Sequence, residues 1–108
     1  MKIEDFLSLH ETLCEQAREL CRSKGHDYSG VQDTLKNLKT SEYLGLCDTE
    51  VVALNYIISK VSRLVNVYTQ GEAKVHDEPI KGTIVDLINY ANILWAIMVE
   101  REQANGHD

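Results

Sequence analysis

Residues Ile80 to Val99 read IKGTIVDLINYANILWAIMV, and this stretch decides the fold class. Its apolar side chains recur three and four residues apart, at Ile80, Ile84, Leu87, Ile88, Ala91, Trp95 and Met98. That period predicts a helix that begins just after Pro79 and continues to about Gln103. Because Ile93, Ile97 and Val99 add apolar groups on other sides, we expect this helix to be buried on several sides, which in so small a chain implies a partner.

Two further segments show the same helical period. The first runs from Ile3 to about Ser23, where Gly25 is expected to stop it. The second begins behind Asp48, a plausible capping residue, and continues to about Gln70. Its apolar residues form the seam expected of helix pairing: Val51, Leu54, Ile58, Val61, Val65 and Tyr68.

The connection between these two segments, residues 24–49, contains one short helical pattern, from Val31 to Leu38. The sequence therefore predicts an all-α protein, an antiparallel bundle of three long helices plus a short helix in the 24–49 connection. We expect residues 1–108 to form a single domain that pairs as a homodimer or a higher homo-oligomer.

Charge and composition exclude several classes of partner. The 108 residues include 17 acidic and 11 basic side chains, a net charge of -6, which argues against binding nucleic acid or an anionic membrane. No uninterrupted apolar run approaches the ~18 to 20 residues of a membrane span, and the start of the chain is too acidic for a signal peptide. Three cysteines without CxxC spacing predict reduced thiols. We therefore expect a soluble, cytoplasmic protein.

Polar side chains inside the apolar Ile80–Val99 stretch are the main candidates for a site. Asp86, Asn89 and Tyr90 share one helix surface, and Gly82 leaves an opening one turn earlier. An unpaired buried carboxylate costs several kcal/mol, so something polar must accompany Asp86. Two interpretations remain open: a ligand or metal approaches there, or Asp86 forms an ion pair with a cation of the preceding helix.

Two other groups of residues could contact a ligand. Lys60 and Arg63 stand one turn apart and could hold phosphate oxygens, unless they merely form a solvated face. In the segment Lys24–Gly30, the residues His26, Asp27 and Tyr28 lie between glycines and suggest a binding loop with a ring that stacks on a base. The alternative is a turn capped by Asp27, with Tyr28 packed on the core.

These motifs resemble a known family. The family is the phage and bacterial nucleotide modification associated domain 1, and the similarity runs from about Lys24 to Leu94. The similar segments are His26-Asp27-Tyr28, Lys60-x-x-Arg63-Leu64 and Asp77-Glu78-x-x-x-Gly82-x-x-x-Asp86-Leu87-x-Asn89-Tyr90-Ala91. The resemblance implies an all-helical protein of phage or mobile-element origin that works on nucleotides in the host cell cytoplasm.

The layout is also similar to the all-alpha nucleoside triphosphate pyrophosphohydrolases (MazG-like), which hold magnesium on acidic helices. This chain departs from their pattern, because it has no ExxE and carries Thr83-x-x-Asp86 at the position of ExxD. It also has Gly82 where the nucleotide-associated family has an acidic residue. Glu78 and Asp86 are eight residues apart, about 12 Å along a helix, which is too far for them to share one ion easily.

Three hypotheses follow. In the preferred one, the protein binds or sequesters a nucleotide or a nucleotide-derived signal: Lys60 and Arg63 contact phosphates, Asp86 and Asn89 contact ribose or base, and Tyr28 or Tyr90 stacks. In the second, it is a Mg²⁺-dependent pyrophosphohydrolase with the metal on Glu78 and Asp86. In the third, it is a helical dimerisation or interaction module. No nucleophile elbow, P-loop, HExxH or Rossmann pattern supports other chemistry.

Overall fold

The all-α prediction is confirmed by a computed structural model, which describes residues 1–29, 35–70 and 80–106, with only the backbone given for 25–29. The three long helices are α1 (Ile3–Ser29), α3 (Thr49–Gln70) and α5 (Ile80–Asn105). The connection holds a 3-10 helix, η1 (Lys36–Lys39), followed by the short helix α2 (Thr40–Tyr43).

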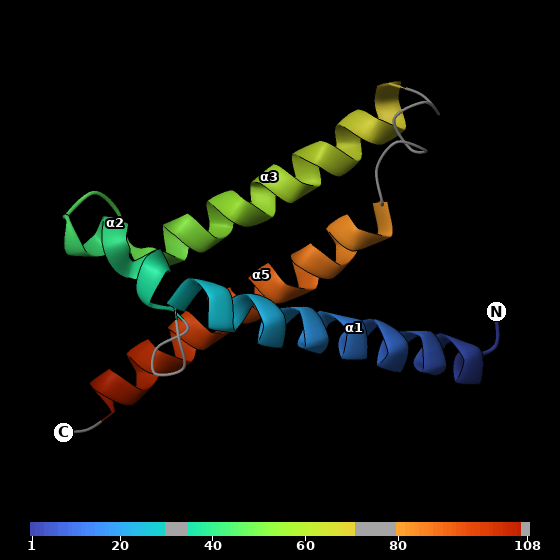
Figure 1. The fold of residues 1–108 in the computed structure, drawn as a ribbon, viewed down its shortest axis with the longest axis horizontal. Coiled ribbons are helices and arrows are strands. Elements are labelled where there is room, and N and C mark those ends of the chain that lie inside the picture. The colour runs from blue at the N-terminus through green and yellow to red at the C-terminus, as the bar shows by residue number, and fades with distance from the viewer. Residues whose placement is uncertain (30–34, 71–79, 107–108) are drawn as a thin grey trace.

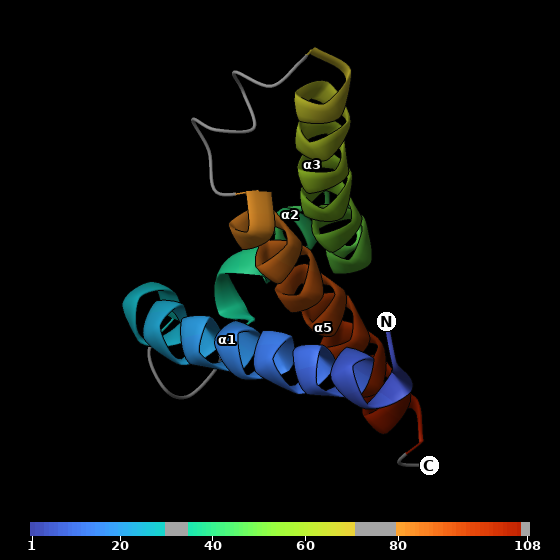
Figure 2. The ribbon, with the colours of Figure 1, turned by 90° about the vertical axis from the view of Figure 1, so that its right-hand side faces the viewer.

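The helices α3 and α5 lie side by side and run in opposite directions, and α1 crosses α5 at an angle (Figures 1 and 2). The result is an elongated molecule with extents of 50 × 33 × 25 Å. Helix α5 is therefore the central element, since it packs against both of the other long helices.

Small side chains allow α3 and α5 to approach closely. Ala53 of α3 is fully buried, and it belongs to a core cluster with Leu35 and Ile97 of α5. Thr49 and Thr83 are buried on the same two helices. Leu35 comes directly before η1, so its burial holds this part of the connection against the α3–α5 pair.

Two boundaries differ from the prediction. Helix α1 continues to Ser29, six residues beyond the expected end, and Gly25 does not stop it. A glycine inside a helix costs only about 1 kcal/mol, which the surrounding helical hydrogen bonds can offset. The predicted short helix in the connection is confirmed, but η1 and α2 cover residues 36–43 and so overlap the expected Val31–Leu38 only at 36–38, while residues 31–34 lie outside the described residues.

A turn closes α2. Gly45 has a φ of 75°, the left-handed conformation that favours glycine, and its N–H donates to the carbonyl of Glu42 at 2.9 Å. The N–H of Leu46 donates to the carbonyl of Ser41 at 2.8 Å, which completes the hydrogen bonding of the helix end. This turn directs the chain toward the start of α3.

The apolar faces that the sequence marks on α3 and α5 are largely exposed in a single chain. On α3 the whole predicted seam is exposed, from 42% at Val51 to 71% at Tyr68, and the opposite side of the helix packs against α5. On α5 the buried residues are Ile80, Thr83, Val85 and Ile97, while Trp95 is 67% exposed. A three-four apolar period marks a face that avoids water, and it does not say whether the covering element belongs to the same chain.

Helix α1 is the least buried of the long helices. Ala17 is buried where α1 meets the rest of the molecule, whereas Ile3, Phe6 and Leu9 are more than half exposed. The N-terminal half of α1 projects away from its crossing with α5 (Figure 1).

By length and composition alone, helix α5 could also cross a membrane. This was not expected from the sequence, because no uninterrupted apolar run in it approaches the length of a span. The core helices of soluble proteins meet the same requirement, so this finding assigns no location to the protein. The expected cytoplasmic location and the expected lack of a membrane partner remain predictions.

Candidate ligand site at the meeting of the three long helices

Two of the predicted site residues line a hollow where α1, α3 and α5 meet. The hollow has a volume of about 340 Å³, at the lower end of the range for small-molecule sites. Gln16 and Leu20 border it from α1 and Arg63 from α3, and the α5 residues that border it are Gly82, Thr83, Val85 and Asp86. The sequence placed Arg63, Gly82 and Asp86 at such a site, and the structure brings them together.

Asp86 is held by an ion pair across the two antiparallel helices. The Nζ of Lys60 lies 3.1 Å from the Oδ2 of Asp86, and both side chains are 22% exposed. The ion-pair interpretation of Asp86 is therefore correct, with Lys60 as the cation. The pair does not close the hollow, because Asp86 also lines it.

One face of the Tyr90 ring, predicted to stack on a base, is covered by the ring of Tyr56. The rings of Tyr56 and Tyr90 are stacked, with centroids 4.9 Å apart and planes inclined by 3°. This contact joins α3 to α5 one turn beyond the Lys60–Asp86 pair, and it was not predicted from the sequence. Asn89, also predicted as a contact, is half-buried on α5 and does not border the hollow.

The remaining predicted residues lie outside the described side chains. His26, Asp27 and Tyr28 fall within the last turns of α1, so the expected binding loop is helical, and nothing is described of their side chains. Glu78 lies outside the described residues altogether. Their role in binding remains a prediction.

A magnesium site was predicted on Glu78 and Asp86. Among the described residues, no three His, Cys, Asp or Glu side chains gather in a way that could hold a metal ion. A cation at Asp86 would also have to compete with Lys60 for the carboxylate. The described residues alone therefore do not make a site for Mg²⁺, which prefers several oxygen ligands in octahedral geometry. Because Glu78 lies outside them, the magnesium site remains a prediction.

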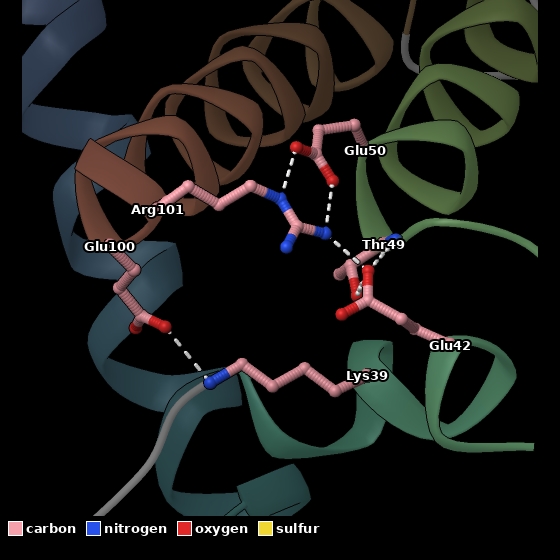
Figure 3. Close-up of polar contacts among 6 residues, drawn as sticks. All are labelled: Lys39, Glu42, Thr49, Glu50, Glu100 and Arg101. Carbon is pink, nitrogen blue, oxygen red and sulfur yellow. Dashed lines mark hydrogen bonds and ion pairs between the residues drawn. The ribbon is translucent and has the colours of Figure 1, made fainter. Parts of the chain in front are cut away.

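A polar cluster among the described residues lies elsewhere, around Arg101 near the end of α5 (Figure 3). The guanidinium donates two hydrogen bonds to the carboxylate of Glu50, one of them at 2.7 Å, and a third to Glu42. Glu42 also accepts the backbone N–H of Thr49 at 2.9 Å and its hydroxyl at 3.2 Å. We call Glu42, Thr49, Glu50 and Arg101 the Arg101 cluster.

The Arg101 cluster shifts the ionisation of its members. The Thr49 N–H, and then Arg101, hold the pKa of Glu42 below its usual range. Hydrogen bonding to Arg101 does the same to the pKa of Glu50, and the two carboxylates raise the pKa of Arg101. Beside the cluster, Lys39 pairs with Glu100 at 2.9 Å (Figure 3). Arg101 bonds both carboxylates and Thr49 bonds Glu42, which ties α2 to α3 and α5, so we assign the cluster to anchoring α2 rather than to ligand binding.

The sequence contained one signal for the Arg101 cluster. Glu50 stands at the start of α3 and Arg101 near the end of α5. In an antiparallel pair the start of one helix lies beside the end of the other, so the sequence could have shown these opposite charges to be neighbours, but the pair was not predicted. Glu42 could not be placed, because its position depends on the Gly45 turn.

Comparison of the chain with protein-family models, with curated proteins and with solved structures finds no match. The resemblance described above, and the phage origin that it implies, therefore remain expectations.

Proposed function

We propose that this protein binds a nucleotide or a nucleotide-derived signal in the hollow between α1, α3 and α5. The observation that carries the proposal is the position of Arg63 and Asp86 on the walls of this hollow, beside Gly82. A guanidinium has five N–H donors in a planar fork that fits phosphate, so Arg63 is a side chain suited to binding phosphate oxygens. Gly82 has no side chain, which leaves space beside Asp86 for the ligand.

Lys60 and Asp86 complete the chemistry of the proposed site. A phosphate near Arg63 would also attract the ammonium of Lys60, which already lies next to the hollow through its pair with Asp86. The carboxylate of Asp86 accepts hydrogen bonds, so it suits a ribose hydroxyl or an exocyclic amine. The three groups sum to a charge of +1 (two cations and one carboxylate), the sign that favours an anionic ligand.

Binding is a better fit to this geometry than hydrolysis. Cleavage of a nucleoside triphosphate by a metal-dependent route needs several carboxylates around the metal, and among the described residues that line the hollow Asp86 is the one carboxylate. A volume of about 340 Å³ accommodates part of a nucleotide, with the remainder lying along the open side. We therefore favour a protein that holds or sequesters its ligand over one that cleaves it.

The test measures the melting temperature and the heat of binding with nucleoside mono- and triphosphates and with cyclic dinucleotides. A ligand at 100 times its dissociation constant should stabilise the protein by about 2.7 kcal/mol, an easily measured rise in Tm. Arg63→Ala should weaken binding at least tenfold. Arg22→Ala is the matched control, because Arg22 lies on the exposed face of α1 and pairs with Glu19 of the same helix.

Gly82→Leu provides an independent probe of the same hollow, since its side chain would occupy the space beside Asp86. It should abolish binding while the helical circular dichroism is retained. If none of these nucleotides changes Tm, or if Arg63→Ala and Arg22→Ala bind equally well, the proposal is wrong.

A second candidate function is a helical dimerisation module. It is favoured by the exposed apolar seam of α3, which a soluble monomer has no reason to retain. The two candidates are compatible, because the hollow and the seam involve opposite sides of α3.

A further inference from the structure

The apolar seam of α3 contains Val51, Leu54, Ile58, Val61, Val65 and Tyr68. Its exposed fractions range from 42% to 71%. These six side chains together present on the order of 500 Å² of apolar surface, more than half of the roughly 800 Å² that each partner buries in a stable interface. A continuous apolar stripe of this size marks a contact surface.

The spacing of the seam identifies the kind of partner. The residues alternate three and four apart over five intervals, which is the a and d pattern of helices that pair by inserting side chains between those of a facing helix. An identical stripe on a second copy provides that facing helix without any further surface, because a two-fold axis brings the same patch of both copies together.

The charges around the seam also fit a second copy. The positions that directly flank it along the helix hold Asn55, Ser62 and Thr69 on one side and Glu50, Ile57 and Leu64 on the other, and the carboxylate of Glu50 is paired with Arg101. Between residues 51 and 70 the charged side chains are Lys60 and Arg63, and both lie on the side of α3 that meets α5. Two chains of net charge -6 can therefore approach along this face without placing like charges opposite each other.

The same features disfavour a lipid surface. A helix that lies on a membrane carries Lys and Arg beside its apolar face, where they reach the headgroups. Here Lys60 is engaged by Asp86 across the α3–α5 contact, and the flanks of the seam carry no Lys or Arg.

We infer that a second copy of this chain docks on the α3 seam, so that α3 is covered by α5 on one side and by the α3 helix of its partner on the other. The inference does not depend on ligand binding. It names the face on which the expected homodimer forms.

The test is the mass of the protein in solution, measured by light scattering and by sedimentation. The wild-type chain should have twice the 12.3 kDa of one copy at micromolar concentration. Ile58→Glu places a charge at the centre of the seam and should raise the dissociation constant at least 100-fold. Ser59→Glu adds the same charge one residue away on an exposed position off the seam and should change it less than twofold.

A labelling measurement covers the case in which Ile58→Glu fails to fold. Val65→Cys lies in the seam and Asn66→Cys beside it, and both positions are exposed in one chain. If the seam is covered, a maleimide should modify Val65→Cys at least ten times more slowly than Asn66→Cys, and dilution should remove the difference. The inference is overturned by a wild-type monomer at 200 μM or so, by equal masses of the two glutamate variants, by equal labelling rates, or by a monomer that binds lipid vesicles through this seam.

Discussion

The ammonium of Lys60 lies 3.1 Å from the carboxylate of Asp86, joining the middle of α3 to the N-terminal half of α5. The pair has two consequences. It gives Asp86, the charged side chain of the apolar helix α5, a partner at the helix interface. It also places Lys60 next to the hollow that Asp86 lines and that we propose as the ligand site.

The first prediction concerns the energy of this pair. In a double-mutant cycle with Lys60→Met and Asp86→Asn, the two single variants should each lose stability, and the double variant should recover part of the loss. The coupling should be about 1 kcal/mol, more than an exposed pair contributes, because both side chains are mostly buried. Urea unfolding measures it. Additive losses within about 0.3 kcal/mol would show that the pair adds no stability.

The second prediction concerns the Arg101 cluster. Arg101→Ala removes three hydrogen bonds and leaves two neighbouring carboxylates to repel each other, so Tm should fall by several degrees. Arg101→Lys should restore little of this, because an ammonium cannot make the planar two-bond contact with Glu50. Differential scanning calorimetry provides the measurement. Arg22→Ala, which breaks an exposed pair within one helix, serves as the control and should leave Tm unchanged.

The third prediction follows from the lowered pKa values of Glu42 and Glu50. A carboxyl group whose pKa is lower in the folded state contributes its full stabilisation above its ordinary pKa and loses it as the pH falls through the folded value. Stability should therefore decrease as the pH drops below about 4.5, the ordinary value for glutamate. In Glu42→Gln and Glu50→Gln the decrease should be shallower. Unfolding curves collected from pH 7 to pH 3 would show equal slopes if the cluster were not responsible.

The fourth prediction concerns the turn after α2. Gly45 adopts a φ of 75°, and a Cβ atom added there would meet nothing within 4 Å. Gly45→Ala should therefore cost about 1 kcal/mol through backbone strain alone. Gly45→Asn should cost less, because asparagine tolerates the left-handed region. If alanine and asparagine cost the same in urea unfolding, the strain does not arise from the backbone.

The helices of this protein could be predicted from the sequence, and their packing could not. The three-four period placed α3 and α5 within a few residues of their observed ends, because amphipathic spacing is a local property. The same period marks faces that are mostly exposed in a single chain. Ala53 and Thr83 are buried and Lys60 pairs with Asp86 across the α3–α5 contact, and small or polar residues of this kind carry no periodic signal.

The candidate site was predictable in part. Asp86 was recognisable as a carboxylate that needed a partner, and Lys60 was one of two possible partners on the preceding helix. The choice between Lys60 and Arg63 required the angle at which the helices cross. The Tyr56–Tyr90 stack depends on that same angle, which is why a tyrosine predicted to stack on a base stacks on another tyrosine.

The Arg101 cluster has a consequence for the order in which the chain acquires its structure during synthesis. Glu42 and Glu50 emerge from the ribosome about fifty residues before the guanidinium that neutralises them both, since Arg101 is 59 positions after Glu42 and 51 after Glu50. Until then, the two carboxylates repel each other and α2 has no cation to fasten it. A nascent chain halted ahead of Arg101 should therefore be cleaved by a protease near α2, and a chain released just after it should resist.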